Sequence, residues 1–260
     1  MSEPEVALDI VKATKLFGGL RAIDRVSFST RRGEIFGIIG PNGAGKSTLF
    51  NLITGTLPMT SGRISYHGMD ITGLGPEAVA TKGIIRTFQS ATVFPNKTLE
   101  ENVRLGYLFG RLNVPRRFAD RAYLRRSRDE AQVRTGEVIE FCGLTEARHR
   151  VAGDLAYGLQ KTLGIAMALA AGPSQLLMDE PAAGLNPVET RLMGDLILRI
   201  RNERAIDVVL VEHDIAMVTR ICDRILVINR GQILAIDLPE AIRHNPDVIE
   251  AYLGADIDLH

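Results

Sequence analysis

Hydrophobic residues in the first third of the chain form short runs between turn residues, the pattern of β-strands. Residues 35–39 (Ile-Phe-Gly-Ile-Ile) are an uninterrupted apolar run, which is typical of a strand covered on both faces. Val26 and Phe28 indicate an earlier strand, and residues 61–66 indicate a later one. A glycine-rich segment follows the run at 35–39, and we expect a helix at 47–54 after it.

The middle of the chain changes from strand signals to helix signals. Thr98-Leu99-Glu100-Glu101 matches a capping box, so we expect a helix to begin at Leu99. Residues 135–142 are expected to form a second helix and residues 159–171 a third, because glycine follows each segment and ends its helical pattern.

The last third alternates strands and helices again. Apolar strands at 176–178 and 208–211 flank an expected helix at 188–202. Residues 225–236 contain a hairpin, with its turn at Asn229-Arg230-Gly231. The sequence therefore predicts an α/β core that is interrupted by a helical insert.

Charge and composition narrow the class of protein. The chain of 260 residues carries 31 basic and 31 acidic residues, so no net field favours nucleic acid or an anionic membrane. The N-terminus lacks a secretory signal, and the longest apolar run, Ile165–Ala171, is far shorter than the ~18 residues of a membrane span. Cys142 and Cys222 have no paired spacing, and we interpret them as core residues in a reducing compartment. We expect a soluble, cytoplasmic protein whose membrane role comes through partners.

The segment after the strand at 35–39 matches the phosphate-binding loop G-x-x-x-x-G-K-[ST]. It consists of Gly40, Pro41, Asn42, Gly43, Ala44, Gly45, Lys46 and Ser47. Glycines let backbone N–H groups surround phosphate oxygens, and the helix N-terminus adds partial positive charge. We expect Lys46 to neutralise the β- and γ-phosphates of ATP, Ser47 to bind Mg²⁺ and Thr48 to donate to the α-phosphate. A chance glycine turn is the alternative, which the strand before and the helix after disfavour.

A phosphate loop alone leaves open a kinase, a GTPase, a motor or a transporter ATPase. The strand at 176–178 leads into two acids, Asp179 and Glu180, and the strand at 208–211 leads towards His213. Asp179 is a candidate to hold Mg²⁺ through water, and Glu180 to polarise the attacking water as general base. His213 is a candidate γ-phosphate contact, and Gln89 a candidate ligand of Mg²⁺ or water. Taken singly, the acids suit a solvated surface, and a lone histidine or glutamine is more often structural.

These motifs in this order resemble the ABC ATPase family over essentially the whole chain. The resemblance also includes a segment at Ala183-Gly184-Leu185-Asn186 that matches the family's D-loop. It implies a phosphate-loop ATPase core with a mixed sheet, flanking helices and an N-terminal antiparallel β part, and an inserted helical subdomain. It also implies a head-to-tail dimer that holds ATP between subunits, and adenine stacking on Phe17, for which core packing is the alternative role.

The resemblance implies three parts of the chain. The ATP-binding α/β core comprises residues 1–88 and 172–238, the helical signature subdomain residues 89–171, and a C-terminal helical tail residues 239–260.

One motif departs from the family pattern. The usual signature is Leu-Ser-Gly-Gly-Gln, which faces the ATP of the other subunit, whereas this chain has Leu155, Ala156, Tyr157, Gly158 and Leu159. The serine hydroxyl is absent at Ala156, but Gly158 and a helix N-terminus remain to face an anion. Loss of one hydrogen bond to a charged group costs about 1.5–3 kcal/mol. Either the ATP site completed by this segment is slower, or contacts from the partner compensate.

Several stretches resemble the subunits that power branched-chain amino-acid uptake. They are residues 16–20, 83–89, 94–96, 155–158, 182–187 and 245–254. The resemblance implies a second ATPase subunit, integral membrane permease subunits, an external solute-binding protein, and a peripheral location on the inner face of the plasma membrane. Relatives that serve amides, urea or aromatic acids keep the solute open.

The helical insert contains an arginine-rich stretch. Eight arginines lie between Arg111 and Arg134 against three acids, which suits a solvated helix face or a contact with membrane subunits or anionic headgroups. Nucleic acid is disfavoured, because Phe118 and Tyr123 are the only nearby aromatic residues for stacking.

Three other functions are weighed against a transporter ATPase. They are an ABC ATPase of DNA repair or translation, a non-hydrolysing regulator and a small-molecule kinase. Sustained heptads and a second cassette are absent from the sequence, and Lys46, Glu180 and His213 occur together. These features favour a transporter ATPase.

Overall fold

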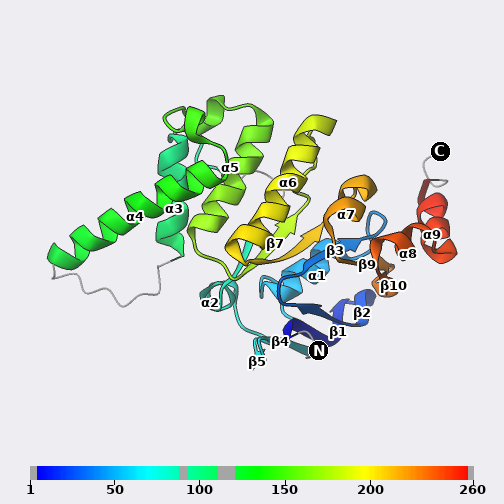
Figure 1. Ribbon diagram of the computed structural model, residues 1–260. Helices are drawn as coiled ribbons and strands as arrows, with labels where there is room; N and C mark the ends of the chain where they lie inside the picture. Colours follow the sequence, from blue (N-terminus) through cyan, green and yellow to red (C-terminus); the bar gives the residue numbers. More distant parts are fainter. Residues whose placement is uncertain (1–4, 88–92, 111–120, 257–260) are drawn as a thin grey trace.

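Two β-sheets and a set of helices make up the computed structural model, which describes residues 5–87, 93–110 and 121–256 (Figure 1). The smaller sheet is antiparallel, and its strand order is β2-β1-β4-β5. Its strands are β1 (Val6–Phe17), β2 (Leu20–Arg31), β4 (Ser61–Tyr66) and β5 (Met69–Asp70).

The larger sheet has six strands in the order β10-β9-β3-β8-β7-β6. All its neighbours are parallel except β10 and β9, which form a hairpin. The strands are β3 (Ile35–Ile39), β6 (Ile84–Thr87), β7 (Gln175–Asp179), β8 (Asp207–Val211), β9 (Arg224–Asn229) and β10 (Gln232–Asp237). The predicted strands at 35–39 and 61–66 and the predicted hairpin are therefore confirmed.

The larger sheet separates two hydrophobic cores. Every residue of β3, β7 and β8 is buried, as expected of strands covered on both faces. Successive side chains point to opposite faces, so Ile35 and Ile39 join one core while Phe36 and Ile38 join the other. The second core also includes residues of the antiparallel sheet, which explains why the two sheets pack together.

Nine α-helices are described and surround the sheets or form the helical insert (Figure 1). They are α1 (Lys46–Ile53), α2 (Pro76–Thr81), α3 (Leu99–Phe109), α4 (Arg121–Phe141), α5 (Tyr157–Ala170), α6 (Pro187–Arg204), α7 (Ile215–Ile221), α8 (Pro239–Arg243) and α9 (Pro246–Asp256).

The structure confirms one predicted helix start and corrects several others. Thr98 and Glu101 form both bonds of the predicted capping box, and α3 begins at Leu99. Helix α4 begins at Arg121 rather than at residue 135, because its first half is polar and gives no apolar periodicity. Helices α1, α5 and α6 begin one or two residues earlier than predicted, at Lys46, Tyr157 and Pro187.

The helical insert comprises α3, α4 and α5 and stands beside the sheets in Figure 1. Asn102 of α3 is fully buried, and its amide accepts from Phe94 N at 2.7 Å and donates to the carbonyls of Phe94, Lys97 and Thr98. Antiparallel pairing of Thr98 with Val151 then joins this segment to the chain that leads into α5. The division into domains at 88/89, 171/172 and 238/239 stays a prediction.

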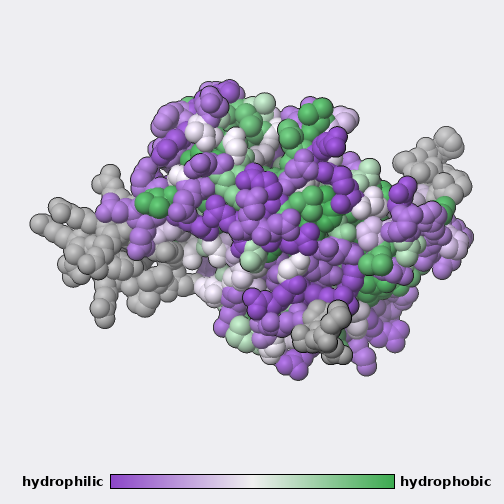
Figure 2. Space-filling view, in the orientation of Figure 1, coloured by the Kyte–Doolittle hydropathy of each residue, from purple (hydrophilic) through white to green (hydrophobic). Residues whose placement is uncertain are grey.

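The surface is mostly hydrophilic on the face drawn in Figure 2, where hydrophobic residues occur in separate patches. Within the described ranges, no helix combines the length and the apolar character that a membrane span requires. Cys142 and Cys222 are buried free thiols, and burial raises the pKa of both, that of Cys142 to about 12. Their predicted position in the core is confirmed.

Close contact between α3 and α5 provides the first prediction. A Cβ on Gly106 would lie 2.2 Å from Met167 O, so Gly106→Ala should force the two helices apart. We expect a loss of about 1–3 kcal/mol in the free energy of unfolding, measured with urea. Gly136→Ala on α4 is the control, because a Cβ there meets no atom within 4 Å and should stabilise by about 0.5–1 kcal/mol. Equal stability of the two variants would contradict this packing.

Candidate functional site

The phosphate loop connects the end of β3 to the start of α1. Gly45 has φ +109°, and a Cβ there would lie 2.8 Å from Ala22 O, so only glycine fits this position. Asn42 and Gly43 are exposed, whereas Ala44 is buried. Ser47 is exposed and Thr48 is half-buried in the first turn of α1. The loop and the helix N-terminus thus have the arrangement that the motif requires.

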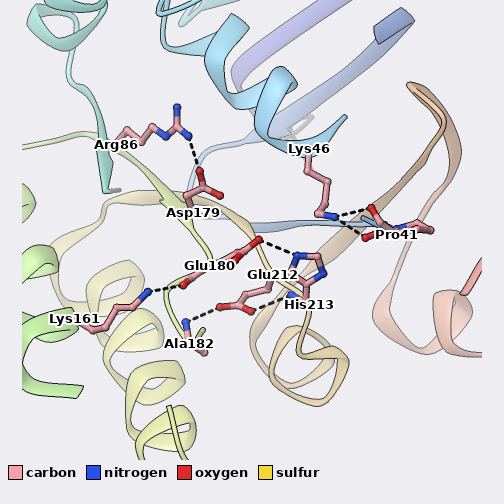
Figure 3. Close-up of polar contacts among 10 residues, drawn as sticks. Pro41, Lys46, Arg86, Lys161, Asp179, Glu180, Ala182, Glu212 and His213 are labelled. Atoms are coloured by element: carbon pink, nitrogen blue, oxygen red, sulfur yellow. Dashed lines mark hydrogen bonds and ion pairs between the residues drawn. The ribbon is translucent and has the colours of Figure 1, made fainter. Parts of the chain in front are cut away.

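Lys46 is the buried cation of this loop. Its Nζ donates to Gly40 O at 2.7 Å and to Pro41 O at 2.9 Å (Figure 3). Burial lowers the pKa of Lys46, and the negative charges of Glu180 and Asp179 act in the opposite direction. These charges act on Lys46 because the sheet brings the two acids close to the loop.

Asp179 ends β7 with its side chain buried. One oxygen, Oδ2, accepts from Arg86 Nη2 at 2.5 Å, and Arg86 Nη1 donates to Asn51 Oδ1 of α1 at 2.6 Å. The other oxygen, Oδ1, is buried and has no hydrogen-bond partner among the residues that the structure describes. A buried carboxylate oxygen without a partner is costly, so Oδ1 suits a cation or a water bound to one.

Glu180 and His213 meet at the ends of neighbouring strands. Glu180 Oε1 lies 2.8 Å from His213 Nε2, and Glu180 N donates to Val211 O at 2.9 Å. The two predicted side chains therefore form one polar pair, which Figure 3 shows beside Lys46. The backbone of Glu180 adopts φ +49°, which is uncommon for a residue other than glycine.

Glu212 is a site residue that the sequence reasoning missed. It is 2% exposed, and its carboxylate accepts from Ala182 N at 2.6 Å and from His213 N at 3.0 Å. Burial raises the pKa of Glu212, while these backbone donors lower it. The carboxylate ties the turn after Glu180 to the turn that carries His213. The position of Glu212 directly after an apolar strand could have indicated a role in the site, but the sequence analysis assigned that role to the neighbouring His213.

The sequence analysis also missed two cationic residues that bond to Asp179 and Glu180. Arg86 of β6 binds the Asp179 carboxylate, and Lys161 of α5 donates from Nζ to Glu180 O at 3.1 Å. Both side chains line a cavity of about 570 Å³ between α2, β6, α3 and α5. The sequence does not indicate that Lys161 is buried, because lysine usually lies on the solvent-exposed face of a helix.

The signature segment lies at the N-terminus of α5. Ala156 is the N-cap residue and provides no side-chain cap, as expected for alanine. Tyr157 is 48% exposed, and a Cβ on Gly158 would lie 2.6 Å from Glu189 Oε1 of α6. Leu159 packs against the larger core and is half-buried, so its side chain has a packing role as well.

The remaining candidate residues have different outcomes. Phe17 is 47% exposed at the end of β1, so it is not a core residue, and Lys15 Nζ lies 5.0 Å from its ring centroid. Gln89 lies outside the described residues, as do residues 111–120 of the arginine-rich stretch. Asn186 of the D-loop segment caps α6 by accepting from Val188 N and Glu189 N at 3.0 Å each.

Comparison with known proteins decides the family. A family model described as ABC transporter matches residues 23–183, which is more than half of the chain. The chain belongs to the ABC transporter family. A second model, described as Branched-chain amino acid ATP-binding cassette transporter, matches residues 232–258.

Curated relatives of this ABC transporter protein match over nearly their whole length. It is 42% identical to the high-affinity branched-chain amino acid transport ATP-binding protein LivG of Salmonella typhimurium, over 98% of this chain and 99% of the relative. The similarly named BraF of Pseudomonas aeruginosa is 42% identical, and LivG of Escherichia coli is 41% identical, with the same coverage. The resemblance to the branched-chain amino-acid subfamily is therefore confirmed.

Solved structures confirm the predicted fold class. A nucleotide-free ATP-binding cassette from an ABC transporter has a TM-score of 0.82 at 31% identity, with 95% of this chain and 98% of that chain covered. An ADP conformation of an ATP-binding cassette has a TM-score of 0.82 at 30% identity, with 96% and 99% covered. This ABC transporter chain is therefore an ATPase with the predicted mixed sheet, N-terminal antiparallel part and helical insert.

Burial of Glu212 makes stability depend on pH in a defined direction. Because its pKa is raised on folding, the stability that it contributes is complete below the unfolded-state value, near 4.5, and is lost as the pH rises through the folded-state value. Glu212→Gln does not titrate. The free energy of unfolding of the wild type minus that of Glu212→Gln should therefore decrease from about pH 4.5 upward, measured with urea at several pH values. A difference that increases with pH would contradict this assignment.

Proposed function

We propose that this chain binds and hydrolyses ATP to power the import of branched-chain amino acids. The observation that carries the proposal is the convergence of the phosphate-loop cation, two acids and a histidine at one edge of the parallel sheet. Lys46, Asp179, Glu180 and His213 come from the ends of β3, β7 and β8 and from the loop after them. The curated relatives named above support the transport role and the solute class.

Each residue of the site has a proposed task. Backbone N–H groups of Gly40–Gly45 surround the phosphates, Lys46 neutralises the β- and γ-phosphates, and Thr48 donates to the α-phosphate. Glu180 is the general base that polarises the attacking water. His213, whose ring nitrogen is within hydrogen-bond distance of Glu180, orients that carboxylate and contacts the γ-phosphate.

The donor set also fits Mg²⁺. Asp179 Oδ1 is a buried oxygen without a partner among the described residues, and Ser47 is an exposed residue in the first turn of α1. We propose that Ser47 and Asp179, the latter through water, hold the ion together with Gln89. Bound Mg²⁺ would supply charge neutralisation at the phosphate oxygens.

A head-to-tail dimer completes the proposed site. ATP held by one phosphate loop would face the partner's Ala156-Tyr157-Gly158-Leu159, whose backbone at the α5 N-terminus provides partial positive charge. Phe17 is exposed at the end of β1, as a residue that stacks on adenine must be. The second subunit is either another ATPase chain or a copy of this one.

The remaining partners follow from the transport role. We propose integral membrane permease subunits, an external solute-binding protein reached through them, and a peripheral position on the inner face of the plasma membrane. The arginine-rich stretch is proposed to contact the permease subunits. The solute is proposed from the relatives' printed names, since no described residue of the ATP site selects it.

Reconstitution tests this function. The chain should co-purify with integral membrane subunits, and its ATPase activity in proteoliposomes should rise when binding protein loaded with leucine, isoleucine or valine is added. Stimulation by an amide or by urea instead would reassign the solute. Purification of the native complex without any membrane protein would overturn the transport role.

Glu180 gives a direct test of the catalytic assignment. Glu180→Gln removes the base but keeps the shape of the side chain, so the ATP hydrolysis rate should fall by about 10²–10⁴-fold. Binding of a fluorescent ATP analogue should remain within a few fold of the wild type. Glu146→Gln, which lies in the described turn Thr145–Ala147 of the helical insert, serves as the matched control. Loss of nucleotide binding in Glu180→Gln would contradict a purely catalytic role.

The altered signature gives a second test. Restoring the hydroxyl with Ala156→Ser should raise ATPase activity in the assembled complex by on the order of tenfold, because one charged hydrogen bond is regained. Leu159 packs against the core, so the double change with Leu159→Gln should give the same gain with lower stability. No change in activity with either variant would show that contacts from the partner already compensate.

A further inference from the structure

Glu180 needs support from the surrounding structure. Its φ of +49° lies in the left-handed region, where a residue other than glycine costs on the order of 1 kcal/mol or more and persists only when its neighbours hold it. Glu180 N donates to Val211 O at 2.9 Å, and Glu180 O accepts from Ala183 N at 3.2 Å. The first bond comes from the neighbouring strand β8, and the second comes from the turn that contains Glu180.

The third bond to this backbone comes from a different part of the fold. Lys161 lies in the second turn of α5 and is 5% exposed, and its Nζ donates to Glu180 O at 3.1 Å (Figure 3). A buried ammonium group destabilises the fold unless it donates hydrogen bonds to acceptors. The carbonyl oxygen of Glu180 is such an acceptor for Lys161 Nζ. The same Nζ lies 5.7 Å from the ring centroid of Tyr157, the first residue of α5.

These contacts lie within the first two turns of α5. The first turn of α5 carries Tyr157 and Gly158 of the signature, and the next turn carries Lys161. Since α5 is a continuous helix of 14 residues, a shift of the signature end moves Lys161 with it. Through this bond, Lys161 links the helical insert to the backbone of Glu180.

We propose that Lys161 is a positioning residue for ATP hydrolysis, which fixes the backbone of Glu180 and couples it to the signature end of α5. It acts through the backbone of Glu180. This inference rests on the proposed role of Glu180 and adds a residue, and a direction of coupling, to it.

Substitution of Lys161 tests the proposal in the assembled complex. Lys161→Met keeps the length of the side chain without the charge, and we expect kcat to fall by about tenfold to hundredfold while KM for ATP stays within twofold. Lys161→Arg keeps a cation of similar reach and should restore most of kcat. Lys12→Met, at an exposed lysine of β1, is the matched control for loss of a positive charge and should leave both constants unchanged.

A double variant separates positioning from general damage to the fold. If Lys161 acts through Glu180, then Lys161→Met should cause less than a twofold further loss in single-turnover hydrolysis when Glu180→Gln is already present. A full multiplicative loss, or a KM that rises as much as kcat falls, would overturn the proposal. If Lys161→Met does not fold, the comparison of Lys161→Arg with Lys161→Gln decides by the same two constants. A wild-type complex without ATPase activity would instead refute the proposed function before any variant is compared.

Discussion

Parallel pairing of β3, β8 and β7 is the constraint on which the site depends. In the register of the sheet, Ile38 lies opposite Val211, and Val211 lies opposite Asp179, so three strands end at the same level. Each strand is followed at once by a functional segment: the phosphate loop, the turn to His213, or Glu180. A single slip of register would move these side chains apart by a whole residue and reverse the faces of the strand.

Buried charge at this edge is held by paired contacts. Arg86 binds Asp179, and the backbone amides of Ala182 and His213 donate to Glu212; the exposed side chain of His213 contacts Glu180. A charged group removed from water is strongly destabilising unless it is paired in this way, so the partners are as necessary as the acids themselves. Asp179 Oδ1, by contrast, lacks a partner among the described residues, and it is the oxygen that we propose binds a cation through water.

The sequence was sufficient for features with a local cause. The phosphate loop, the apolar strand at 35–39 and the capping box of Thr98 and Glu101 each depend on neighbouring residues, and the structure has all three. The bonds of Glu212 to Ala182 and of Lys161 to Glu180 could not be predicted, because the partners lie 30 and 19 positions away and only the tertiary fold brings them together. The start of α4 was wrong for the opposite reason: its polar first half is helical without an apolar stripe.

Helix α5 carries the altered signature and also bonds to the backbone of Glu180, which bears on the effect of the missing serine. Loss of a hydroxyl at Ala156 removes one contact at the end of the helix, but the rigid axis of α5 and the bond from Lys161 to Glu180 remain. Gly158 lies close to α6, because a Cβ built on it would be 2.6 Å from Glu189 Oε1, and Glu189 forms a capping box with Asn186 at the start of α6. Helix α5 therefore lies against α6 and bonds to the backbone of Glu180, so the proposed catalytic base stays positioned although the signature lacks the hydroxyl.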